Sequence, residues 1–357
     1  MDFRNPLPQR LRDGLNLTII TVHAAGEVGD VIIGGVSDPP NCKSMFEKMQ
    51  HFWKYNDNIR NLILQEPRGR ASMCTNLVLP PCDSRADAGF LIMESDEWVP
   101  MSGSNTICTT TVLLEMGMIE MKEPTTKVSL DTAAGLVTVT AECEGGKCKS
   151  VAFDNVPSFV WELDCPIEVP GLGTVKVDVA WGGMIYVLVD AESAGMEISS
   201  VNGANLVKVG EMIKRAAQAQ IMPVHPENAE IKGVSNFVWM GKPEVIGEEI
   251  RAYNAVVVSP GRLDRSPCGT GTCARMTVMH ARGQLKVDQV LRHVSPIGTE
   301  FPSHIRGLTK VGKYDAVLPT VKGSAWITGF KQVVLDPQDP FPEGFRVGDA
   351  WHLGDRK

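Results

Sequence analysis

Two short stretches of this chain, MSGSNT at residues 101–106 and PCGTGT at residues 267–272, align with each other without a gap. In each, a glycine-containing turn follows a strand-like run and opens a segment with a helical pattern. A glycine closes both segments at the same spacing, at Gly117 and Gly283. Glycine often ends a helix in the left-handed conformation. The match predicts that the chain is a duplication with an offset of about 166 residues.

The elements around the two junctions occur in the same order in both halves. In the first half we expect a strand, a turn near Gly26 and a second strand within residues 16–36, then a helix over residues 43–64. In the second half, an apolar strand at 184–190 precedes a helix over about 204–220. Further strands are expected at residues 76–79, 89–94, 127–130, 136–141, 150–155, 237–240 and 255–258. We place the two halves at residues 1–173 and 174–331, with residues 332–357 returning to the first half.

The composition fits an ordinary globular protein that does not bind nucleic acid. The 357 residues include 35 Lys and Arg against 42 Asp and Glu, which gives a net charge of −7. A phosphate-binding surface shows as a basic excess or as basic clusters, and the sequence has neither. The 34 glycines and 23 prolines favour many turns and hence a β-rich fold. No apolar run is long enough for a membrane span and the first residues lack a signal core, so we expect a cytoplasmic protein.

The cysteines and histidines do not form the pattern of a disulfide framework or a metal site. There are nine cysteines, an odd number, and no Cys-x-x-Cys pair. Cys143 and Cys148 flank a Glu-Gly-Gly-Lys turn, which we interpret as an exposed hairpin tip. The seven histidines lack metal-ligand spacing, so no metal is expected. The acidic stretch at residues 94–97 is expected to form a solvated turn.

The two helix starts are candidate anion-binding groups. The first N–H groups of a helix have no partner within the helix, and they lie at the positive end of its dipole. Two such starts facing each other would bind a carboxylate, which can accept N–H donors from both sides. The donors expected at these starts are Gly103, Ser104, Asn105, Gly269, Thr270 and Gly271.

The residue before each turn is a candidate proton-transfer group. At a helix start the pKa of the Cys268 thiol should fall from about 8.5 toward neutrality, which would make the thiolate a usable base. Ser102 holds the matching position, and its hydroxyl is the weaker base of the two. Two such groups on opposite sides of a carboxylate-bearing carbon suit stereoinversion. The structural alternatives are that Cys268 is a buried small hydrophobe, and that Ser102 and Ser104 are only N-caps.

The string DRSPCGTGT at residues 264–272 resembles the proline racemase family. Three shorter stretches resemble it as well, namely NVPSFV at 155–160, GTEF at 298–301 and ITG at 327–329, and the likeness extends over roughly residues 16–346. The resemblance implies a cofactor-independent enzyme of the diaminopimelate-epimerase-like fold. In that α+β fold, two pseudo-symmetric domains, each a curved, mostly antiparallel sheet or barrel around a central helix, enclose one site. Members commonly form homodimers.

The resemblance also implies roles for individual residues. Ser102 and Cys268 would be the acid/base pair, Asp264 would receive the ring ammonium group, and the helix starts would bind the carboxylate of a small cyclic imino acid. The carboxylate-binding residues would be Gly103, Ser104, Asn105, Gly269 and Thr270. An amino-acid zwitterion does need an anion opposite the helix-start donors.

The sequence departs from the common family pattern at the first junction. Family racemases and 4-hydroxyproline epimerases carry Cys-Gly-His there, whereas this chain has Ser102-Gly103-Ser104. A Ser-then-Cys class within the family is associated with 3-hydroxyproline chemistry, and this chain is similar to that class. The hypothesis is a dehydratase and 2-epimerase of trans-3-hydroxy-L-proline. It would form Δ1-pyrroline-2-carboxylate by syn elimination or cis-3-hydroxy-D-proline by inversion. The alternatives are a 4-hydroxyproline 2-epimerase, a proline racemase, or a non-catalytic amino-acid-binding protein.

Overall fold

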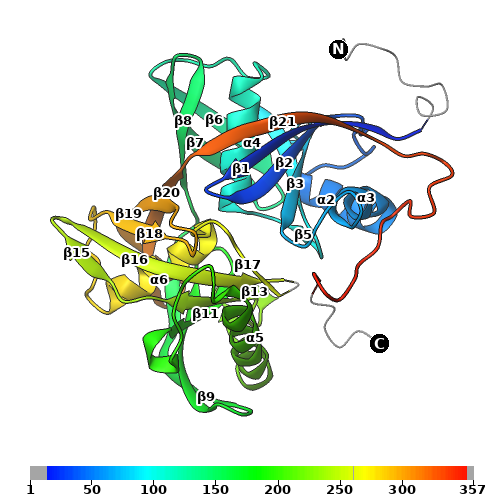
Figure 1. The fold of residues 1–357 in the computed structure, drawn as a ribbon. Helices are drawn as coiled ribbons and strands as arrows, with labels where there is room; N and C mark the ends of the chain where they lie inside the picture. The colour runs from blue at the N-terminus through cyan, green and yellow to red at the C-terminus, as the bar shows by residue number, and fades with distance from the viewer. Residues whose placement is uncertain (1–13, 260, 352–357) are drawn as a thin grey trace.

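The computed structural model describes residues 14–259 and 261–351, which form two halves, one above the other in Figure 1. The helices are α2 (Met45–Tyr55), α3 (Asn58–Leu64), α4 (Gly103–Glu115), α5 (Gly203–Gln220) and α6 (Gly269–Ala281), with a 3-10 turn, η1 (Glu192–Ala194). The first half contains strands β1 (Asn16–Ala24), β2 (Glu27–Gly34), β3 (Met73–Leu79), β4 (Ala88–Glu94), β5 (Trp98–Val99), β6 (Thr125–Thr132), β7 (Gly135–Glu144) and β8 (Lys147–Asp154). The chain returns to this half in β21 (Ala325–Val334).

The second half contains a closed ring of strands. Its strands are β9 (Ser158–Val169), β10 (Gly173–Trp181), β11 (Ile185–Asp190), β14 (Asn236–Met240), β15 (Glu244–Ile246), β16 (Glu249–Val258), β17 (Arg262–Leu263), β18 (Leu291–Val294), β19 (Glu300–Val311) and β20 (Tyr314–Gly323). The ring runs β9, β10, β11, β14, β16, β18, β19, β20 and back to β9. A small separate hairpin joins β12 (Val224–His225) to β13 (Asn228–Lys232).

The first half repeats this arrangement around its own helix. The strands pair in the row β21, β1, β2, β3, β4, β6, β7 and β8, and β8 then pairs with β20 of the other half. Most pairs are antiparallel; β2 with β3 and β4 with β6 are parallel, as are β11 with β14 and β16 with β18 in the second half. The expected α+β fold, with a curved and mostly antiparallel sheet around a central helix in each half, is confirmed.

The central helix α4 is buried on all sides. Every residue from Gly103 to Leu114 is buried, including four threonines. The hydroxyls of Thr106 and Thr110 donate to backbone carbonyls one turn earlier, at 2.8 Å each, so these polar groups are satisfied without water. A helix that is buried all round belongs at the centre of a domain, and α6 has the same position in the second half.

The helix expected over residues 43–64 is broken into two. The helix α2 ends at Tyr55, with Asn56 as its C-cap, and α3 starts after Asp57. The Asp57 carboxylate accepts hydrogen bonds from Arg60 at 2.8 and 2.6 Å and from the Trp98 indole at 2.7 Å. These contacts turn the chain so that α3 packs against β3 and β4. Hydrophobic periodicity alone does not reveal this break between the two helices.

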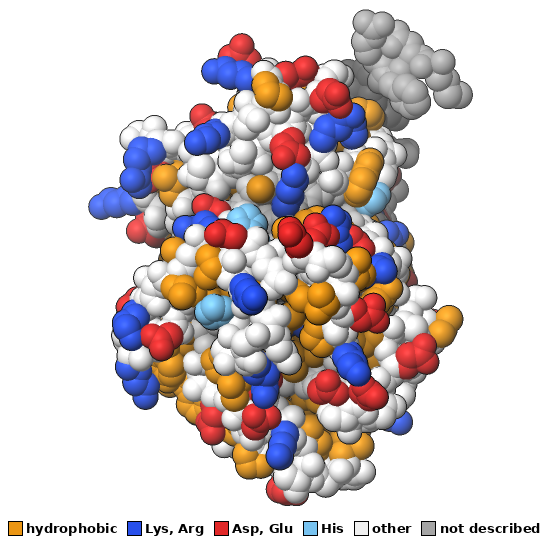
Figure 2. All heavy atoms as spheres, turned by 90° about the vertical axis from the view of Figure 1, so that its left-hand side faces the viewer, with side chains coloured by type: hydrophobic (Ala, Val, Ile, Leu, Met, Phe, Trp, Pro, Cys, Tyr) orange, Lys and Arg blue, Asp and Glu red, His pale blue; other side chains and the backbone are white. Residues whose placement is uncertain are grey.

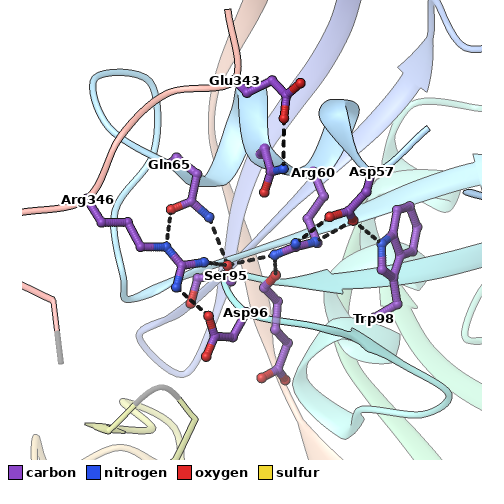
Figure 3. Close-up of polar contacts among 10 residues, drawn as sticks. Asp57, Arg60, Gln65, Ser95, Asp96, Trp98, Glu343 and Arg346 are labelled. Atoms are coloured by element: carbon purple, nitrogen blue, oxygen red, sulfur yellow. Dashed lines mark hydrogen bonds and ion pairs between the residues drawn. The ribbon is translucent and has the colours of Figure 1, made fainter. Parts of the chain in front are cut away.

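The segment after β21 lies along the first half and supports the turn before Ser102. Arg346 donates hydrogen bonds to the Gln65 side chain, the Asp96 carboxylate and the Ser95 carbonyl, as Figure 3 shows. The expectation of a solvated acidic turn at residues 94–97 is therefore wrong. Ser95 is fully buried, and burial raises the pKa of Glu94 to about 7.

The hairpin at Cys143 and Cys148 is present, but its cysteines are not exposed. They face each other across β7 and β8, and both are buried in the core of the first half. The exposed tip is limited to residues 144–146. Side chains alternate between the two faces of a strand, and the register directs both thiols to the core face.

The surface carries charges of both signs. Figure 2 shows Lys and Arg interspersed with Asp and Glu on one face, without a patch of a single sign. Among residues 14–259 and 261–351, no helix combines the length and apolarity needed to cross a bilayer. The N-terminal residues in which we expected no signal core lie outside the described residues.

Candidate active site

The N-termini of α4 and α6 meet between the two halves. A Cβ atom added to Gly103 would lie 3.0 Å from Cα of Gly269 and 2.6 Å from Cζ of Phe153. A Cβ atom added to Gly269 would lie 2.9 Å from Cα of Gly103. Nonbonded carbon atoms approach each other to about 3.5–4.0 Å, so both positions require glycine. The fold thus brings the two aligned stretches of the sequence to one place.

Backbone N–H groups at both helix starts are available to bind an anion. The helical ladders begin with the N–H groups of Thr106 and Thr272, which donate to the carbonyls of Ser102 and Cys268. Within the described residues, the earlier N–H groups donate to no backbone carbonyl; they belong to Gly103, Ser104, Asn105, Gly269 and Thr270. A carboxylate between the two starts would satisfy these donors and lie on the positive ends of both helix dipoles.

Cys268 caps α6 with its sulfur. Its backbone φ of 65° lies in the region that favours glycine, and Sγ accepts a hydrogen bond from the Gly271 N–H at 3.4 Å. The Tyr186 hydroxyl lies 3.6 Å from the same sulfur and 2.6 Å from Oγ1 of Thr270. Burial among apolar side chains agrees with the structural alternative for Cys268, yet its sulfur has three polar partners, in Tyr186, Gly271 and Thr270, that can stabilise a thiolate.

The expected lowering of the Cys268 pKa by the helix start is wrong. Burial raises the pKa of this thiol well above its usual range, and the nearby charge of Asp264 raises it further. Hydrogen bonds from Tyr186, Gly271 and Thr270 lower the pKa without outweighing burial. Burial and the charge of Asp264 thus outweigh these hydrogen bonds in setting the pKa of Cys268.

The Ser102 side chain makes no hydrogen bond to the backbone of its helix, so it is not a simple N-cap. Its Oγ accepts a hydrogen bond from Nδ2 of Asn105 at 2.9 Å. Oδ1 of Asn105 in turn accepts a hydrogen bond from Nδ2 of Asn76 at 2.9 Å. Ser104 is buried at the helix start, and its hydroxyl has no hydrogen-bond partner among the described residues. The side chain of Asn105 thus contacts Ser102, while the backbone N–H of Asn105 is one of the donors available at the helix start.

Asp264 lies beside the start of α6 with one carboxylate oxygen free. Its Oδ1 accepts hydrogen bonds from the N–H and the hydroxyl of Ser266, at 2.8 and 2.9 Å. Oδ2 accepts none from the described part of the chain. Burial and the charge of Glu27 raise the pKa of Asp264 to about 8, against the opposing effect of Arg262. An ammonium group at Oδ2 would favour the carboxylate form.

A buried ion pair connects the two halves next to the site. Glu27, at the start of β2, accepts a hydrogen bond from Nη1 of Arg262 at 2.6 Å, and both side chains are almost fully buried. The second oxygen of Glu27 accepts from the backbone N–H of Arg265 at 2.8 Å. Because Glu27 belongs to the first half and Arg262 to the second, the pair holds the loop that carries Asp264.

A cleft with a volume of about 800 Å³ reaches the site at Asp264. Its walls are formed by α5, by residues 261–265 and by residues 348–351 of the C-terminal segment. Ser102 and Cys268 do not line this cleft. In the described residues, no group of three or more His, Cys, Asp or Glu side chains is arranged to hold a metal ion.

Three polar residues around the site were not expected from the sequence: Tyr186, Asn76 and Glu27. Tyr186 comes shortly after Gly182 and Gly183, as the strand over residues 31–33 follows the turn near Gly26, so aligning these turns as well as the helix junctions would have placed Tyr186 near Cys268. Asn76 and Glu27 are polar residues in largely apolar strands. Such residues are buried only when they have a partner, and that pattern was the available signal.

The chain is similar to proteins of known family and structure. A family model described as Proline racemase matches residues 19–346. A solved hydroxyproline epimerase from Agrobacterium vitis, with bound trans-4-hydroxy-L-proline, has 40% sequence identity and a TM-score of 0.84, covering 95% of this chain and 98% of that one. A probable proline racemase from Agrobacterium radiobacter K84, with bound carbonate, has the same identity and TM-score over 94% and 98% of the two chains.

A more distant structure shares the fold alone. A phenazine biosynthesis protein of the PhzF family from Bacillus anthracis has 11% sequence identity and a TM-score of 0.60, covering 90% of this chain and 99% of that one. The two-half architecture around facing central helices is therefore common to proteins whose sequences have diverged widely.

Proposed function

The chain belongs to the proline racemase family, and from that premise we propose that it acts on trans-3-hydroxy-L-proline. Membership of this family supports amino-acid epimerisation as the general activity of the chain. The proposed reaction begins with removal of the Cα proton. The resulting carbanion either expels the 3-hydroxyl group, leading to Δ1-pyrroline-2-carboxylate, or is protonated on its other face, giving cis-3-hydroxy-D-proline.

The observation that carries the proposal is a serine without a basic partner opposite the cysteine. Within the described residues, Ser102 Oγ has one hydrogen-bond partner, the amide of Asn105. An amide does not withdraw a hydroxyl proton, so Ser102 cannot alternate with Cys268 as an equal base. This asymmetry favours a substrate whose reaction can be completed by one base. One base can complete the reaction only if the substrate has a leaving group on the ring face that carries the Cα proton.

The substrate would bind as a zwitterion between the helix starts and Asp264. Its carboxylate would accept the free N–H groups of Gly103, Ser104, Asn105, Gly269 and Thr270. Its ring ammonium group would contact the free Oδ2 of Asp264. Because the charge of Asp264 raises the Cys268 pKa, an ammonium group that neutralises Asp264 makes the thiolate easier to form. The substrate would therefore help to generate the base that attacks it.

Elimination would use Cys268 alone. The thiolate takes the Cα proton, and the electron pair of the broken C–H bond forms a double bond between Cα and C3. The C3–O bond breaks, and the departing hydroxide takes the proton from the Cys268 thiol and leaves as water. In trans-3-hydroxy-L-proline the hydroxyl and the Cα hydrogen lie on the same ring face, so one group can reach both. The enamine then tautomerises to the cyclic imine.

The second candidate is a 4-hydroxyproline 2-epimerase. It is favoured by the Agrobacterium vitis structure, which is similar to this chain and contains trans-4-hydroxy-L-proline. A 4-hydroxyl group is not on the carbon next to Cα, so this substrate can be inverted but cannot lose water in the same way. Ser102 would then have to complete every turnover as the second proton-transfer group.

Separate incubations with trans-3- and trans-4-hydroxy-L-proline distinguish the candidates. We expect the 3-hydroxy isomer to yield an imine that reacts with o-aminobenzaldehyde, and the 4-hydroxy isomer to yield none. Absence of imine, together with rapid inversion of the 4-hydroxy isomer, would establish the epimerase instead. Absence of Cα deuterium exchange in D2O with both isomers would leave the non-catalytic binding protein.

A further inference from the structure

In each half, a polar side chain contacts the proton-transfer residue, Ser102 or Cys268. In the first half this side chain comes from the central helix, and in the second half it comes from the neighbouring strand. Asn105 and Gly271 occupy matching places, each three residues after the residue that it contacts, Ser102 and Cys268. In the first half the donor is a side-chain amide, and in the second half it is the backbone N–H of a glycine.

In the strands beside the two helices, the first half has the glycine and the second half has the polar side chain. Gly29 and Tyr186 each lie three residues after the left-handed glycine of a hairpin turn, Gly26 with a φ of 96° and Gly183 with a φ of 105°. Tyr186 directs its hydroxyl to the sulfur of Cys268. Gly29 has no side chain, so the corresponding space in the first half is open to another residue.

That space is filled by the side chain of Asn105. A Cβ atom added to Gly29 would lie 2.7 Å from Oδ1 of Asn105 and 3.1 Å from Sγ of Cys108. Asn105 is 1% exposed and Asn76 is fully buried. The asparagine therefore has a defined position that depends on glycine in the neighbouring strand.

Asn76 decides which end of the Asn105 amide faces Ser102. Nδ2 of Asn76 donates to the Gly29 carbonyl at 3.0 Å and to Oδ1 of Asn105 at 2.9 Å. With its oxygen held by that donor, Asn105 turns Nδ2 toward Ser102. A lone pair of Ser102 is thus engaged, while its hydroxyl hydrogen has no acceptor among the described residues and is free to point toward a substrate.

We infer that Asn105 and Asn76 are positioning residues that hold Ser102 as a proton donor and stabilise the alkoxide left when it donates. The inference rests on the proposed function. In the inversion, the Cα proton passes to Sγ of Cys268 and the hydroxyl proton of Ser102 passes to the opposite face of Cα. The negative charge then lies on Oγ of Ser102, where the Asn105 N–H donates. Proton exchange with water after product release restores both groups.

The Asn105 side chain therefore controls the product ratio. Inversion needs Ser102, whereas elimination is completed by Cys268, so removing the amide should lower the share of cis-3-hydroxy-D-proline. A hydrogen bond to a charged group is worth about 1.5–3 kcal/mol, which corresponds to a ratio of epimer to imine about 10- to 150-fold lower in Asn105→Ala. The readout is this ratio, because weaker carboxylate binding at the helix start would lower both products together and leave the ratio unchanged.

The decisive variant is Asn105→Asp, which has the same shape. At high pH its carboxylate repels an alkoxide, and at low pH its protonated form can donate to one. The ratio of epimer to imine should therefore rise as the pH falls in Asn105→Asp and stay constant in the wild-type protein, because ionisation of Cys268 affects both products equally. A structural role for Asn105 would not produce this pH dependence.

Gly29→Ala tests the same contact from the neighbouring strand, and Gly34→Ala is its control. A Cβ atom at Gly34 would come no closer than 3.8 Å to Thr18. We expect Gly29→Ala to lower the epimer-to-imine ratio and Gly34→Ala to leave it unchanged. An unchanged ratio in both Asn105→Ala and Gly29→Ala, or a pH-independent ratio in Asn105→Asp, would overturn the inference.

A failure of the proposed function can be distinguished from a failure of the inference about Asn105. If the wild-type protein forms no imine but inverts trans-4-hydroxy-L-proline, the ratio is measured in D2O between inversion and Cα exchange with retention. Inversion requires Ser102, and exchange with retention requires only Cys268. A ratio that falls in Asn105→Ala supports the inference for that substrate, and an unchanged ratio overturns it.

Discussion

Substitution of Gly103 by alanine should separate the two helix starts and reduce both reactions together. The added Cβ atom would lie 3.0 Å from Cα of Gly269 and 2.6 Å from Cζ of Phe153. Ordinary carbon contacts are about 3.5–4.0 Å, so the helix start must move by about 0.5–1 Å and the phenyl ring by about 0.9–1.4 Å. Such overpacking costs about 1–3 kcal/mol of stability. A displacement of about 1 Å between catalytic groups can lower kcat about 100-fold.

The assay measures imine and epimer formation from trans-3-hydroxy-L-proline, beside thermal unfolding. We expect both products to fall by about 100-fold in kcat, with a loss of only a few degrees in Tm. Gly203→Ala is the matched control, because Gly203 also begins a helix and a Cβ atom there would lie 3.5 Å from Leu263. If Gly103→Ala retained activity within about threefold of the wild-type protein, contact between the helix starts would not determine the site geometry.

Three further substitutions test the surroundings of the site. Glu27→Gln removes a carboxylate that raises the pKa of Asp264, so the acid limb of kcat/KM against pH should move to lower pH; an unmoved limb would contradict this coupling. Tyr186→Phe removes a hydrogen bond that lowers the pKa of Cys268, so the same limb should move to higher pH, and a shift the other way would refute the role of the phenol. Arg346→Ala should lower the free energy of unfolding in urea by about 2 kcal/mol, because Gln65, Ser95 and Asp96 lose their common donor. Arg346→Lys keeps the charge without the planar fork, and complete recovery by lysine would refute that explanation.

The aligned junctions predicted a large part of the fold because they combine two independent signals. Each joins a glycine that tolerates close backbone approach to a helix that ends in a left-handed glycine, with φ values of 67° at Gly117 and 69° at Gly283. Repetition of that pattern implied two central helices in related positions. The break between α2 and α3 was not predictable in the same way, because it depends on Asp57 meeting Trp98 from a distant strand.

The limits of the site prediction have a similar physical cause. The sequence alone places Cys268 at a helix start, which would lower the pKa of its thiol. Only the folded structure shows that the same residue is buried near Asp264, and both effects raise that pKa. Tyr186 and Asn105 lie in different elements, yet the first directs a polar atom to Cys268 and the second directs one to Ser102. That a strand residue in one half and a helix residue in the other make equivalent contacts becomes visible only when both halves are compared in three dimensions.

The most direct test is to follow trans-3-hydroxy-L-proline by NMR in D2O with the wild-type protein and with Cys268→Ala. The wild-type protein should convert the substrate to Δ1-pyrroline-2-carboxylate, with part of it appearing as cis-3-hydroxy-D-proline that carries deuterium at Cα. The folded Cys268→Ala variant should do neither, because it lacks the group that removes the Cα proton. Wild-type rates in that variant, or a wild-type protein that leaves this substrate unchanged, would contradict the account.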